Sequence, residues 1–383
     1  MNMLNKKFDY TIAGAGLFGT ILARKLAQQG NKVQILEARD HIAGQLYTHR
    51  EHNTDIHDYG AHIFRTNDDW VWEFVNEFVT FVPFVNSPMA FYKGKMYNMP
   101  FNMNTFNQIF GATNPKDAKE AIDKTRFTGE PTNLEEKAKS LVGSEIYEIL
   151  IKGYTEKQWG RKATDLPASI IRRLPLRFTF DNNYFNAKYQ GIPDEGYTAL
   201  IEGILEKDVP EGSIVVHTGV NVTKKMVDDN IENFGKVIFT GPIDKYYGES
   251  LGKLAYRSLV FEHKYFPDIE NYQGNAVVNY TDGEVPYTRV LEHKHFNRRE
   301  NQTGTHVSWE YPAEHDDTND PYYPINDDFN NELYEKYAEL AKEEGKVVFG
   351  GRLGNYKYFD MQDTIKSAHK MFEAIQNNEV TWK

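Results

Sequence analysis

Short apolar runs at the start of the chain are separated by a glycine turn and a helical stretch, a pattern that predicts a dinucleotide-binding unit. Residues 8–37 read as a buried strand, a tight turn, a helix and a second buried strand that ends in an acid. Gly14, Gly16 and Gly19 have the GxGxxG spacing that lets a backbone approach a pyrophosphate at a helix N-terminus. Glu37 is expected to accept a hydrogen bond from a ribose hydroxyl, which disfavours the 2'-phosphate of NADP.

Apolar positions further along the chain predict a helical part and a separate sheet. Residues 68–81 and much of residues 104–171 have apolar residues at helical spacing, and Asn133 with Glu136 resembles a capping pair at a helix start. Residues 178–193 and three alternating runs between residues 258 and 296 predict an antiparallel sheet. One face of that sheet would be covered and the other could roof a ligand.

Two late segments return to the nucleotide-binding unit. Residues 237–244 predict a short buried strand broken by Gly-Pro, and residues 346–365 predict a strand, a double-glycine turn and the start of a helix. Backbone N–H groups at Gly350 and Gly351 would meet a second part of the same cofactor, as FAD folds require. The predicted fold class is therefore mixed α/β, with a Rossmann-like FAD-binding domain, an inserted helical domain and an antiparallel sheet domain.

The expected boundaries follow from these patterns. The FAD-binding domain takes residues 1–85, 216–248 and 331–383, the sheet domain takes 86–103, 173–215 and 249–330, and the helical domain takes 104–172.

Composition narrows the function classes. At 383 residues the chain is expected to form two or more subdomains, and its net charge of −11 argues against a nucleic-acid partner. It has no cysteine, which excludes disulfides, thiol chemistry and cysteine-ligated metals. No run approaches the roughly 18 apolar residues of a membrane span, and no signal-peptide core precedes the first strand. We therefore expect a cytoplasmic protein without membrane insertion.

Aromatic and arginine side chains in polar loops are candidates for binding a nucleotide sugar. Aromatic rings in such places can stack on a base or a sugar face, although they could equally fill a core between domains. Arginine forks match phosphate oxygens, although a single arginine is often only a solvated charge. The candidates are Tyr154, Trp159, Tyr184, Tyr323, Tyr358, Arg172, Arg173, Arg177, Arg289 and Arg352.

Histidines are less decisive. His62 follows a glycine turn and could face a redox ring, but a structural role is as plausible an interpretation, and the same holds for His57. The chain has no HExxH, GxSxG or P-loop motif, so the sequence predicts neither a metal site nor hydrolysis by a serine nucleophile.

Over almost its whole length the chain resembles bacterial UDP-galactopyranose mutases. The motifs that carry the resemblance are YTIAGAGLFG, YGAHIF, PFNMNTF, KGYTEKQWGR, LPASIIRRLPLRFTFDNNYF, YQGIP, GPID, VPYTR, EHKHF, PYYP and GGRLGNYKYFDM, in this order. The resemblance implies an FAD domain, a helical domain, a six-stranded antiparallel sheet and a homodimer.

The resemblance also implies an isomerase that uses FAD without net redox change. The flavin is first reduced by an external reductant such as NAD(P)H. Its nitrogen 5 then attacks the anomeric carbon of a UDP-sugar, and UDP-galactopyranose and UDP-galactofuranose interconvert. The family implies a role in cell-surface polysaccharide synthesis.

Site residues carry over position by position. Arg173, Arg289, His62 and Tyr358 would be catalytic. The substrate would contact Arg65, Asn86, Tyr154, Thr155, Trp159, Arg173, Tyr184, Arg289, Tyr323 and Tyr358. FAD would contact Gly14, Gly16, Leu17, Phe18, Gly19, Glu37, Ala38, Arg39, Gln45, His62, Gly241, Arg352, Tyr358, Asp360 and Met361. Residues 166–177 would form a mobile flap that carries Arg173, with a companion loop near residues 125–133.

Two departures from the family pattern leave the sugar open. The usual HIGGN reads HIAGQ, with Ala43 and Gln45, and the usual FHT reads Phe64, Arg65 and Thr66. Arg65 adds a fixed charge and donors that suit an acetamido group, so UDP-N-acetylgalactosamine or a dTDP-deoxysugar are alternative substrates. More distant alternatives are an FAD oxidoreductase of the amine-oxidase type and a flavin-binding scaffold without turnover.

Overall fold

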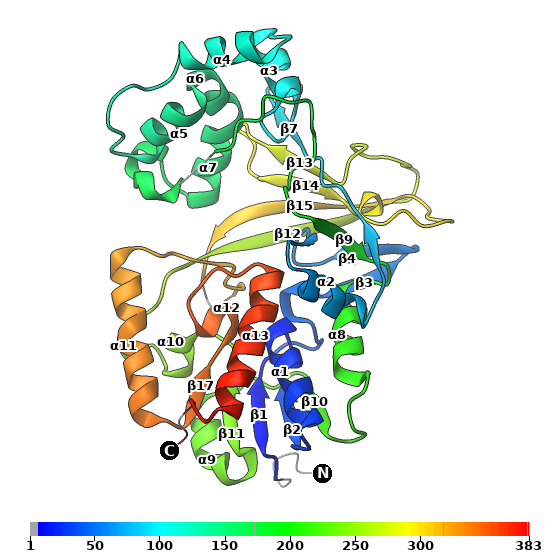
Figure 1. Cartoon of the computed structure of the whole chain (residues 1–383), viewed down its shortest axis with the longest axis vertical. Helices are drawn as coiled ribbons and strands as arrows, with labels where there is room; N and C mark the ends of the chain where they lie inside the picture. The colour runs from blue at the N-terminus through cyan, green and yellow to red at the C-terminus, as the bar shows by residue number, and fades with distance from the viewer. Residues whose placement is uncertain (1–6, 172–173, 317, 381, 383) are drawn as a thin grey trace.

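Three parts of the molecule are stacked along its long axis. The computed structural model describes residues 7–171, 174–316, 318–380 and 382. Figure 1 shows a parallel α/β domain that holds both termini, a long twisted sheet above it, and a group of short helices at the far end. The expected mixed α/β fold class is confirmed.

The nucleotide-binding domain is built on a five-stranded parallel sheet with the order β10-β2-β1-β11-β17. The first strand-turn-helix-strand unit lies where the glycine pattern predicted it, as β1 (Tyr10–Ala13), α1 (Leu17–Gln28) and β2 (Val33–Leu36). Both strands are fully buried, which explains why apolar residues dominate them. Their polar side chains satisfy each other, since the Gln34 amide donates to Thr11 Oγ1 at 2.8 Å. The other strands are β10 (Ile214–His217), β11 (Lys236–Phe239) and β17 (Val347–Phe349).

The strand order of this sheet contradicts one predicted domain boundary. Residues 173–215 were assigned to the sheet domain, but α8 (Tyr197–Glu206) packs on α1, and β10 pairs with β2. The spacing of apolar residues predicts whether a segment forms a helix or a strand. It does not predict which of the two sheets that helix or strand packs against or joins. The other helices of this domain are α9 (Lys224–Phe234), α10 (Ile243–Tyr246), α11 (Asp328–Glu344), α12 (Gly351–Gly354) and α13 (Met361–Gln376).

Small strands connect this domain to the large sheet. β3 (Thr48–Glu51) and β4 (Thr54–His57) form a hairpin, and β5 (Phe64–Thr66), β9 (Tyr189–Pro193) and β6 (Phe81–Pro83) form a three-stranded sheet. The helix predicted over residues 68–81 is shorter, because α2 is Asp69–Asn76 and residues from Phe81 onward pair with β9. A short helical turn, η2, covers Gly44–Leu46.

The large sheet differs from the expected six antiparallel strands. It has seven strands in the order β16-β12-β15-β14-β13-β7-β8, and β7 runs parallel to β13. The β7-β8 hairpin enters from a distant part of the chain, so its direction is not set by a local turn. The bounds are β7 (Met89–Tyr92), β8 (Lys95–Asn98), β12 (Tyr256–Phe266), β13 (Val277–Tyr280), β14 (Arg289–Glu292), β15 (Thr305–Glu314) and β16 (Tyr323–Pro324). A helical turn, η6 (His293–His295), follows β14.

The helical domain has its own apolar core. The predicted cap is confirmed, since the Asn133 side chain accepts from the Glu136 N–H at 3.0 Å, while Glu136 itself accepts from Thr132. Its helices are α3 (Met103–Phe110), α4 (Pro115–Asp123), α5 (Leu134–Val142), α6 (Ser144–Ile146), the π-helical turn η3 (Tyr147–Ile151) and α7 (Lys152–Trp159), followed by the turns η4 (Ala163–Asp165) and η5 (Ala168–Ile170).

Helix α7 is held directly against the large sheet. The ammonium group of Lys157 donates to the carbonyl oxygens of Tyr280, Asp282 and Tyr287 at 2.7 to 2.8 Å. A Cβ at Gly153 would lie 2.3 Å from the Thr281 carbonyl oxygen, so only glycine permits this approach. These contacts of Gly153 and Lys157 fix the position of the other α7 residues relative to the large sheet.

A search of the helices in the described residues finds none with the length and apolar character needed to cross a lipid bilayer.

Candidate active site

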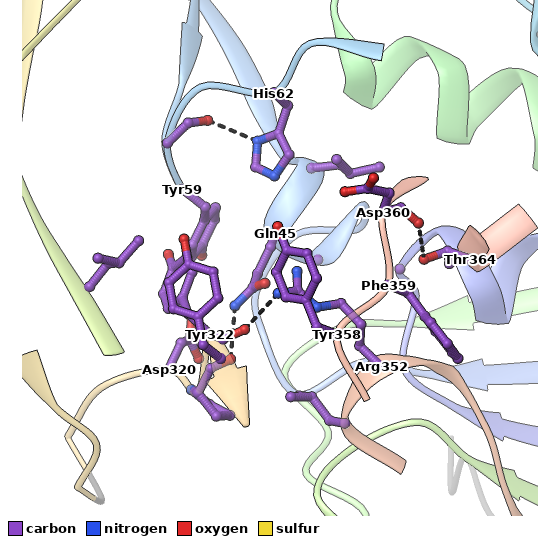
Figure 2. A pocket seen from close by; sticks show the side chains of 18 of the residues that line it. Gln45, Tyr59, His62, Asp320, Tyr322, Arg352, Tyr358, Phe359, Asp360 and Thr364 are labelled. Carbon is purple, nitrogen blue, oxygen red and sulfur yellow. Dashed lines mark hydrogen bonds between the residues drawn. The ribbon is translucent and has the colours of Figure 1, made fainter. Parts of the chain in front are cut away.

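One cavity runs between all three parts of the molecule. Its volume is about 1220 Å³, above the roughly 300–1,000 Å³ of an ordinary small-molecule site, so it has room for more than one ligand. Every described residue that the family resemblance assigns to the substrate or the cofactor lines it, whereas the candidates His57, Arg177 and Gly350 do not. The Gly350 N–H, which was expected to face the cofactor, instead donates to the Phe239 carbonyl at 3.0 Å. Figure 2 shows Gln45, His62, Arg352 and Tyr358 around one part of this space.

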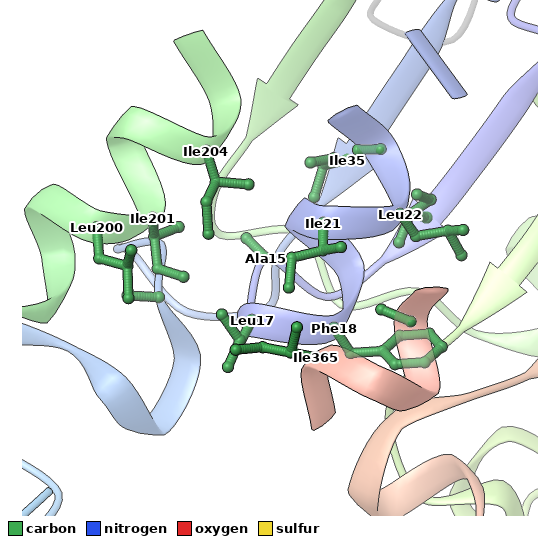
Figure 3. Packing of buried hydrophobic residues seen from close by; sticks show 14 of the residues in the cluster. Ala15, Leu17, Phe18, Ile21, Leu22, Ile35, Leu200, Ile201, Ile204 and Ile365 are labelled. Carbon is green, nitrogen blue, oxygen red and sulfur yellow. The ribbon is translucent and has the colours of Figure 1, made fainter. Parts of the chain in front are cut away.

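The glycine turn forms one end of the cavity. Gly14 has φ +114°, and a Cβ there would lie 2.0 Å from Thr240 Oγ1. A Cβ at Gly19 would lie 2.2 Å from the Gly14 carbonyl oxygen. Figure 3 shows the helix that follows, with Leu17, Phe18 and Ile21 packed against their neighbours. The turn is thus fixed from behind, and Gly14 and Gly16 line the cavity where α1 begins.

Glu37 has contacts that its sequence position did not predict. One carboxylate oxygen accepts from the Ala15 N–H at 2.7 Å and the other from the Arg39 N–H at 2.9 Å. The carboxylate therefore ties the second strand to the glycine turn. It also lines the cavity, and because a carboxylate has several lone pairs it can still accept from a ribose hydroxyl.

The second glycine segment meets the first across the sheet. Gly351 is in the left-handed region at φ +75° and begins α12, and Arg352 follows it. The Arg352 guanidinium donates to the Tyr322 carbonyl at 2.6 Å and lies 4.7 Å from the centre of the Tyr358 ring. Its Nε is buried without a hydrogen-bond partner among the described residues. A buried donor without a partner points to an acceptor supplied by a ligand.

His62 points its ring into the middle of the cavity (Figure 2). Its Nδ1 lies 2.8 Å from the Gly60 carbonyl oxygen, so this nitrogen carries the proton and Nε2 is an acceptor. Burial lowers the pKa of His62 to about 4, and the charges of Arg352 and Arg289 act in the same direction. The imidazole is therefore neutral at neutral pH.

A chain of neutral histidines lies behind His62. His57 was among the sequence-based candidates, but no local motif predicted the chain. His57 Nδ1 accepts from the His62 N–H, and His293 Nδ1 accepts from the His57 N–H, both at 3.2 Å. Ser308 Oγ joins His293 to His263 through two contacts of 2.6 Å. Burial lowers the pKa of His57 to about 3. His57 and His293 must stay neutral for their Nδ1 atoms to accept these hydrogen bonds. The linked histidines therefore hold the backbone at His62 in place.

Arg289 stands at the opposite end of the cavity with a buried partner. Its Nε and Nη2 donate to the two oxygens of Glu310 at 2.9 and 2.5 Å, and these residues face each other on β14 and β15. Burial acts to lower the pKa of Arg289, but the Glu310 charge outweighs it and holds the pKa well above its ordinary value. The second amino group, Nη1, lies outside this pair and is suited to an anion in the cavity.

Tyrosines surround Arg289. Tyr323 stacks on Tyr358 with ring centres 5.7 Å apart, and Tyr358 and Tyr184 are 57% and 41% exposed. Burial raises the pKa of Tyr154 to about 12, so its hydroxyl stays protonated. Thr155, Trp159 and Asn86 complete this end. Large exposed rings beside a partly buried cation are suited to a ligand with a flat base or a sugar face.

Arg177 has a structural position instead. It donates to the carbonyl oxygens of Asn183 and Tyr184, and the Tyr184 N–H donates to the Asn86 carbonyl at 2.7 Å. It is absent from the cavity lining and holds the loop that presents Tyr184.

Arg65 is paired with a residue 295 positions away. Its Nη2 donates to Asp360 at 2.8 Å, and its guanidinium carbon lies 4.2 Å from the centre of the Phe185 ring. Asp360 also caps the start of α13. Both residues of the pair line the cavity.

Two predicted cofactor residues, Arg39 and Gln45, are held by residues 320–321, and several polar residues that were not predicted also line the cavity. Arg39 donates to Asp320 at 2.9 Å, and Gln45 donates to the Pro321 carbonyl at 3.1 Å. Tyr59, Asn221, Lys245, Asn279, Asn319, Asp320 and Tyr322 also line the cavity. Most of them lie in loops, but Lys245 lies in α10 and Asn279 on β13. No local motif links these residues, so only the folded chain brings them together.

The predicted catalytic residue Arg173 and its neighbour Arg172 lie outside the described residues. On either side of them, Ile170, Ile171 and Leu174 line the cavity. The start of this segment touches the end of the companion loop, since Asn133 forms an isolated β-bridge with Pro167. The neighbouring Leu134 N–H, at the start of α5, donates to the Leu166 carbonyl at 2.9 Å.

Comparisons with known proteins agree with this arrangement. The family model for UDP-galactopyranose mutase matches residues 149–358, and a model for an NAD(P)-binding Rossmann-like domain matches residues 12–78. A probable UDP-galactopyranose mutase of Klebsiella pneumoniae is 40% identical over 98% of this chain and 97% of its own length. The chain belongs to the UDP-galactopyranose mutase family. Mutases of this family are isomerases, so the chain is an isomerase of this type.

Other relatives show how wide the family is. A dTDP-fucopyranose mutase of Escherichia coli is 39% identical over 96% of this chain and 98% of its own length. A crystal structure of reduced UDP-galactopyranose mutase shares the fold, with a TM-score of 0.72, 15% identity and coverage of 97% of this chain and 94% of that one. A putative protoporphyrinogen oxidase from Exiguobacterium also shares the fold, with a TM-score of 0.67, 13% identity and coverage of 98% and 99%.

Proposed function

We propose that this protein is a flavin-dependent mutase that interconverts UDP-galactopyranose and UDP-galactofuranose. The observation that carries the proposal is the single cavity that joins the glycine turn, through His62, to Arg289 and the tyrosines. A redox cofactor at one end and a nucleotide sugar at the other would meet beside His62. The 40% identical mutase of Klebsiella pneumoniae supports the reaction class.

The residues at the nucleotide end fit FAD. Two glycine segments border this end of the cavity, a Cβ would obstruct the first turn, and the buried Arg352 Nε lacks an acceptor among the described residues. When bound and reduced, the flavin supplies a nucleophilic nitrogen for the anomeric carbon. Arg352 would donate to the cofactor, and neutral His62 would offer an acceptor to a hydroxyl of the cofactor or the sugar.

The protein's own contribution would be positioning. Arg289, with its orientation fixed by Glu310, would hold the diphosphate, and the charge would stabilise the leaving UDP. Tyr184, Tyr323 and Tyr358 would hold the sugar and phosphate against it. Closure of residues 166–177 would exclude water. We further propose an external reductant such as NAD(P)H and a homodimer.

The decisive experiment compares oxidised and reduced protein. We expect purified protein to be yellow, and dithionite-reduced protein to convert UDP-galactofuranose into UDP-galactopyranose over many turnovers per flavin, measured by anion-exchange chromatography. Oxidised protein should show less than about 1% of that rate, because only the reduced ring is nucleophilic. Equal rates in both states would refute a flavin nucleophile. Stoichiometric consumption of an electron acceptor would instead favour the amine-oxidase-type alternative.

The sugar preference is a finer proposal that rests on Arg65. The relatives that match almost equally well bear the names of a UDP-galactopyranose and a dTDP-fucopyranose mutase, so the chain's similarity does not decide between them. Arg65 lines the cavity, and its bond to Asp360 fixes one amino group while the other donors stay available. We propose that these donors reach the substituent on the second sugar carbon and allow UDP-N-acetylgalactosamine.

Arg65→His tests this preference. We expect kcat/KM for UDP-N-acetylgalactosamine to fall about tenfold more than kcat/KM for UDP-galactose, as one lost charge-assisted hydrogen bond of roughly 1.4 kcal/mol predicts. The same assay should include dTDP-fucopyranose. Arg65→Lys is the matched control, because it keeps the charge and removes the fork. Equal loss for both UDP-sugars would show that Arg65 serves only the shared diphosphate.

A further inference from the structure

Three potential metal ligands lie close together at the turn of the β3-β4 hairpin. Glu51 ends β3, His52 lies in the turn, and His306 lies on β15 of the large sheet. Among the described residues these three form a group whose ligand atoms all lie within 4.8 Å of one another. None of them lines the cavity of the active site. We propose that Glu51, His52 and His306 bind a divalent metal ion of the Zn²⁺ class.

The two histidines have the spacing of a metal pair. His52 Nδ1 and His306 Nε2 face each other at 3.0 Å. Two imidazole nitrogens at the Zn–N distance of about 2.0–2.1 Å in tetrahedral geometry are roughly 3.3 Å apart, so the rings need to separate by only a few tenths of an ångström. Because the ring centres are 5.2 Å apart, the two nitrogens point almost straight at each other, so each ring must also tilt for its lone pair to point at the ion.

Glu51 supplies the third ligand. Its side chain is 56% exposed, and its Oε2 lies 4.0 Å from His306 Nδ1. An exposed carboxylate can move by about one rotamer step at little cost. Such a step would carry the oxygen from the Nδ1 side of His306 toward an ion at Nε2. One carboxylate and two imidazoles form a donor set that Zn²⁺ accepts, with water in the fourth position.

The rings are held in place before any ion binds. The backbone of His52 is in the left-handed region, with φ +49°. Its ring stacks on that of Tyr265, with ring centres 3.8 Å apart and an angle of 2° between the ring planes. The same Tyr265 stacks on His306 at 4.6 Å, and its hydroxyl donates to the Thr303 carbonyl. His306 is 5% exposed, so close packing holds its ring in position.

A bound ion would connect two domains. The β3-β4 hairpin belongs to the nucleotide-binding half, and β15 carries Glu310 and Ser308 of the active-site surroundings. The site would therefore hold the hairpin against the large sheet. No spacing in the sequence could reveal it, because His306 is 254 residues from His52.

The test uses the full-length protein without a histidine tag, treated with a chelator and then dialysed. Zn²⁺ is titrated in competition with a chromophoric chelator, and Co²⁺ absorption in the visible reports tetrahedral coordination. We expect one equivalent to bind and to raise the midpoint of thermal unfolding by several degrees. His52→Asn should weaken binding at least about 100-fold. Asparagine tolerates the left-handed turn, so this variant keeps the hairpin.

Two further variants keep the result interpretable. Glu51→Gln should weaken binding and leave the protein folded, since the side chain is largely exposed. His217→Ala removes a histidine on β10, in the other sheet, and should bind like the unaltered protein. No saturable binding by the unaltered protein, or binding unchanged in His52→Asn, would show that the two rings form only a hydrogen bond and would overturn the proposal.

Discussion

Replacing Arg289 by alanine is expected to lower kcat/KM by about 100-fold or more while flavin stays bound. Each charge-assisted hydrogen bond to a diphosphate contributes on the order of 1.5 to 3 kcal/mol, and a misplaced anomeric carbon adds a further loss. The substitution also leaves the Glu310 carboxylate, which is 1% exposed, without its cation. Initial rates of the reduced protein and the flavin absorption spectrum measure the two effects separately.

Three further variants test whether the loss of activity comes from the Arg289 guanidinium itself. Arg289→Lys keeps a charge without the fork and should recover only part of the activity. Arg289→Ala with Glu310→Gln removes the stranded charge and should recover stability but not turnover. Arg50→Ala breaks an arginine–carboxylate pair with Asp55 outside the cavity and should leave kcat/KM unchanged. Near-normal turnover in Arg289→Ala would remove this residue from the site.

Gly14→Ala is expected to lower the flavin content of the purified protein at least about tenfold. The new Cβ would lie 2.0 Å from Thr240 Oγ1, and that hydroxyl is held by its own bond to the Ala13 carbonyl. The backbone at φ +114° is also strained for any residue with a side chain, at a cost of roughly 1–3 kcal/mol. The ratio of flavin to protein absorbance measures the occupancy.

Gly30→Ala is the matched control for this experiment. Gly30 also has a positive φ, +85°, but its Cβ would meet nothing within 4 Å, and it does not line the cavity. The Gly30→Ala protein should lose some stability against unfolding and keep its flavin. Normal flavin content in a folded Gly14→Ala protein would contradict the assignment of this turn to the cofactor.

The nucleotide-binding unit could be predicted because its determinants are local. The glycine spacing, the buried strands and the helix between them lie within residues 8–37, and the structure confirms each element. The same holds for the Asn133 cap, where donor and acceptor are three residues apart. The late strand and double-glycine turn were also predicted, since their pattern is equally short.

The sequence by itself thus determined the elements, the nucleotide-binding turn and, through its motifs, the family of this protein. Only the tertiary structure decided which charges meet: Arg289 with Glu310, Arg65 with Asp360, and His62 with the histidines behind it. It also decided that β7 runs parallel to β13 and that β10 joins the first sheet. The physical reason is that side-chain period and turn residues act over a few positions. Pairing between distant strands depends instead on how whole faces pack, which no local pattern records.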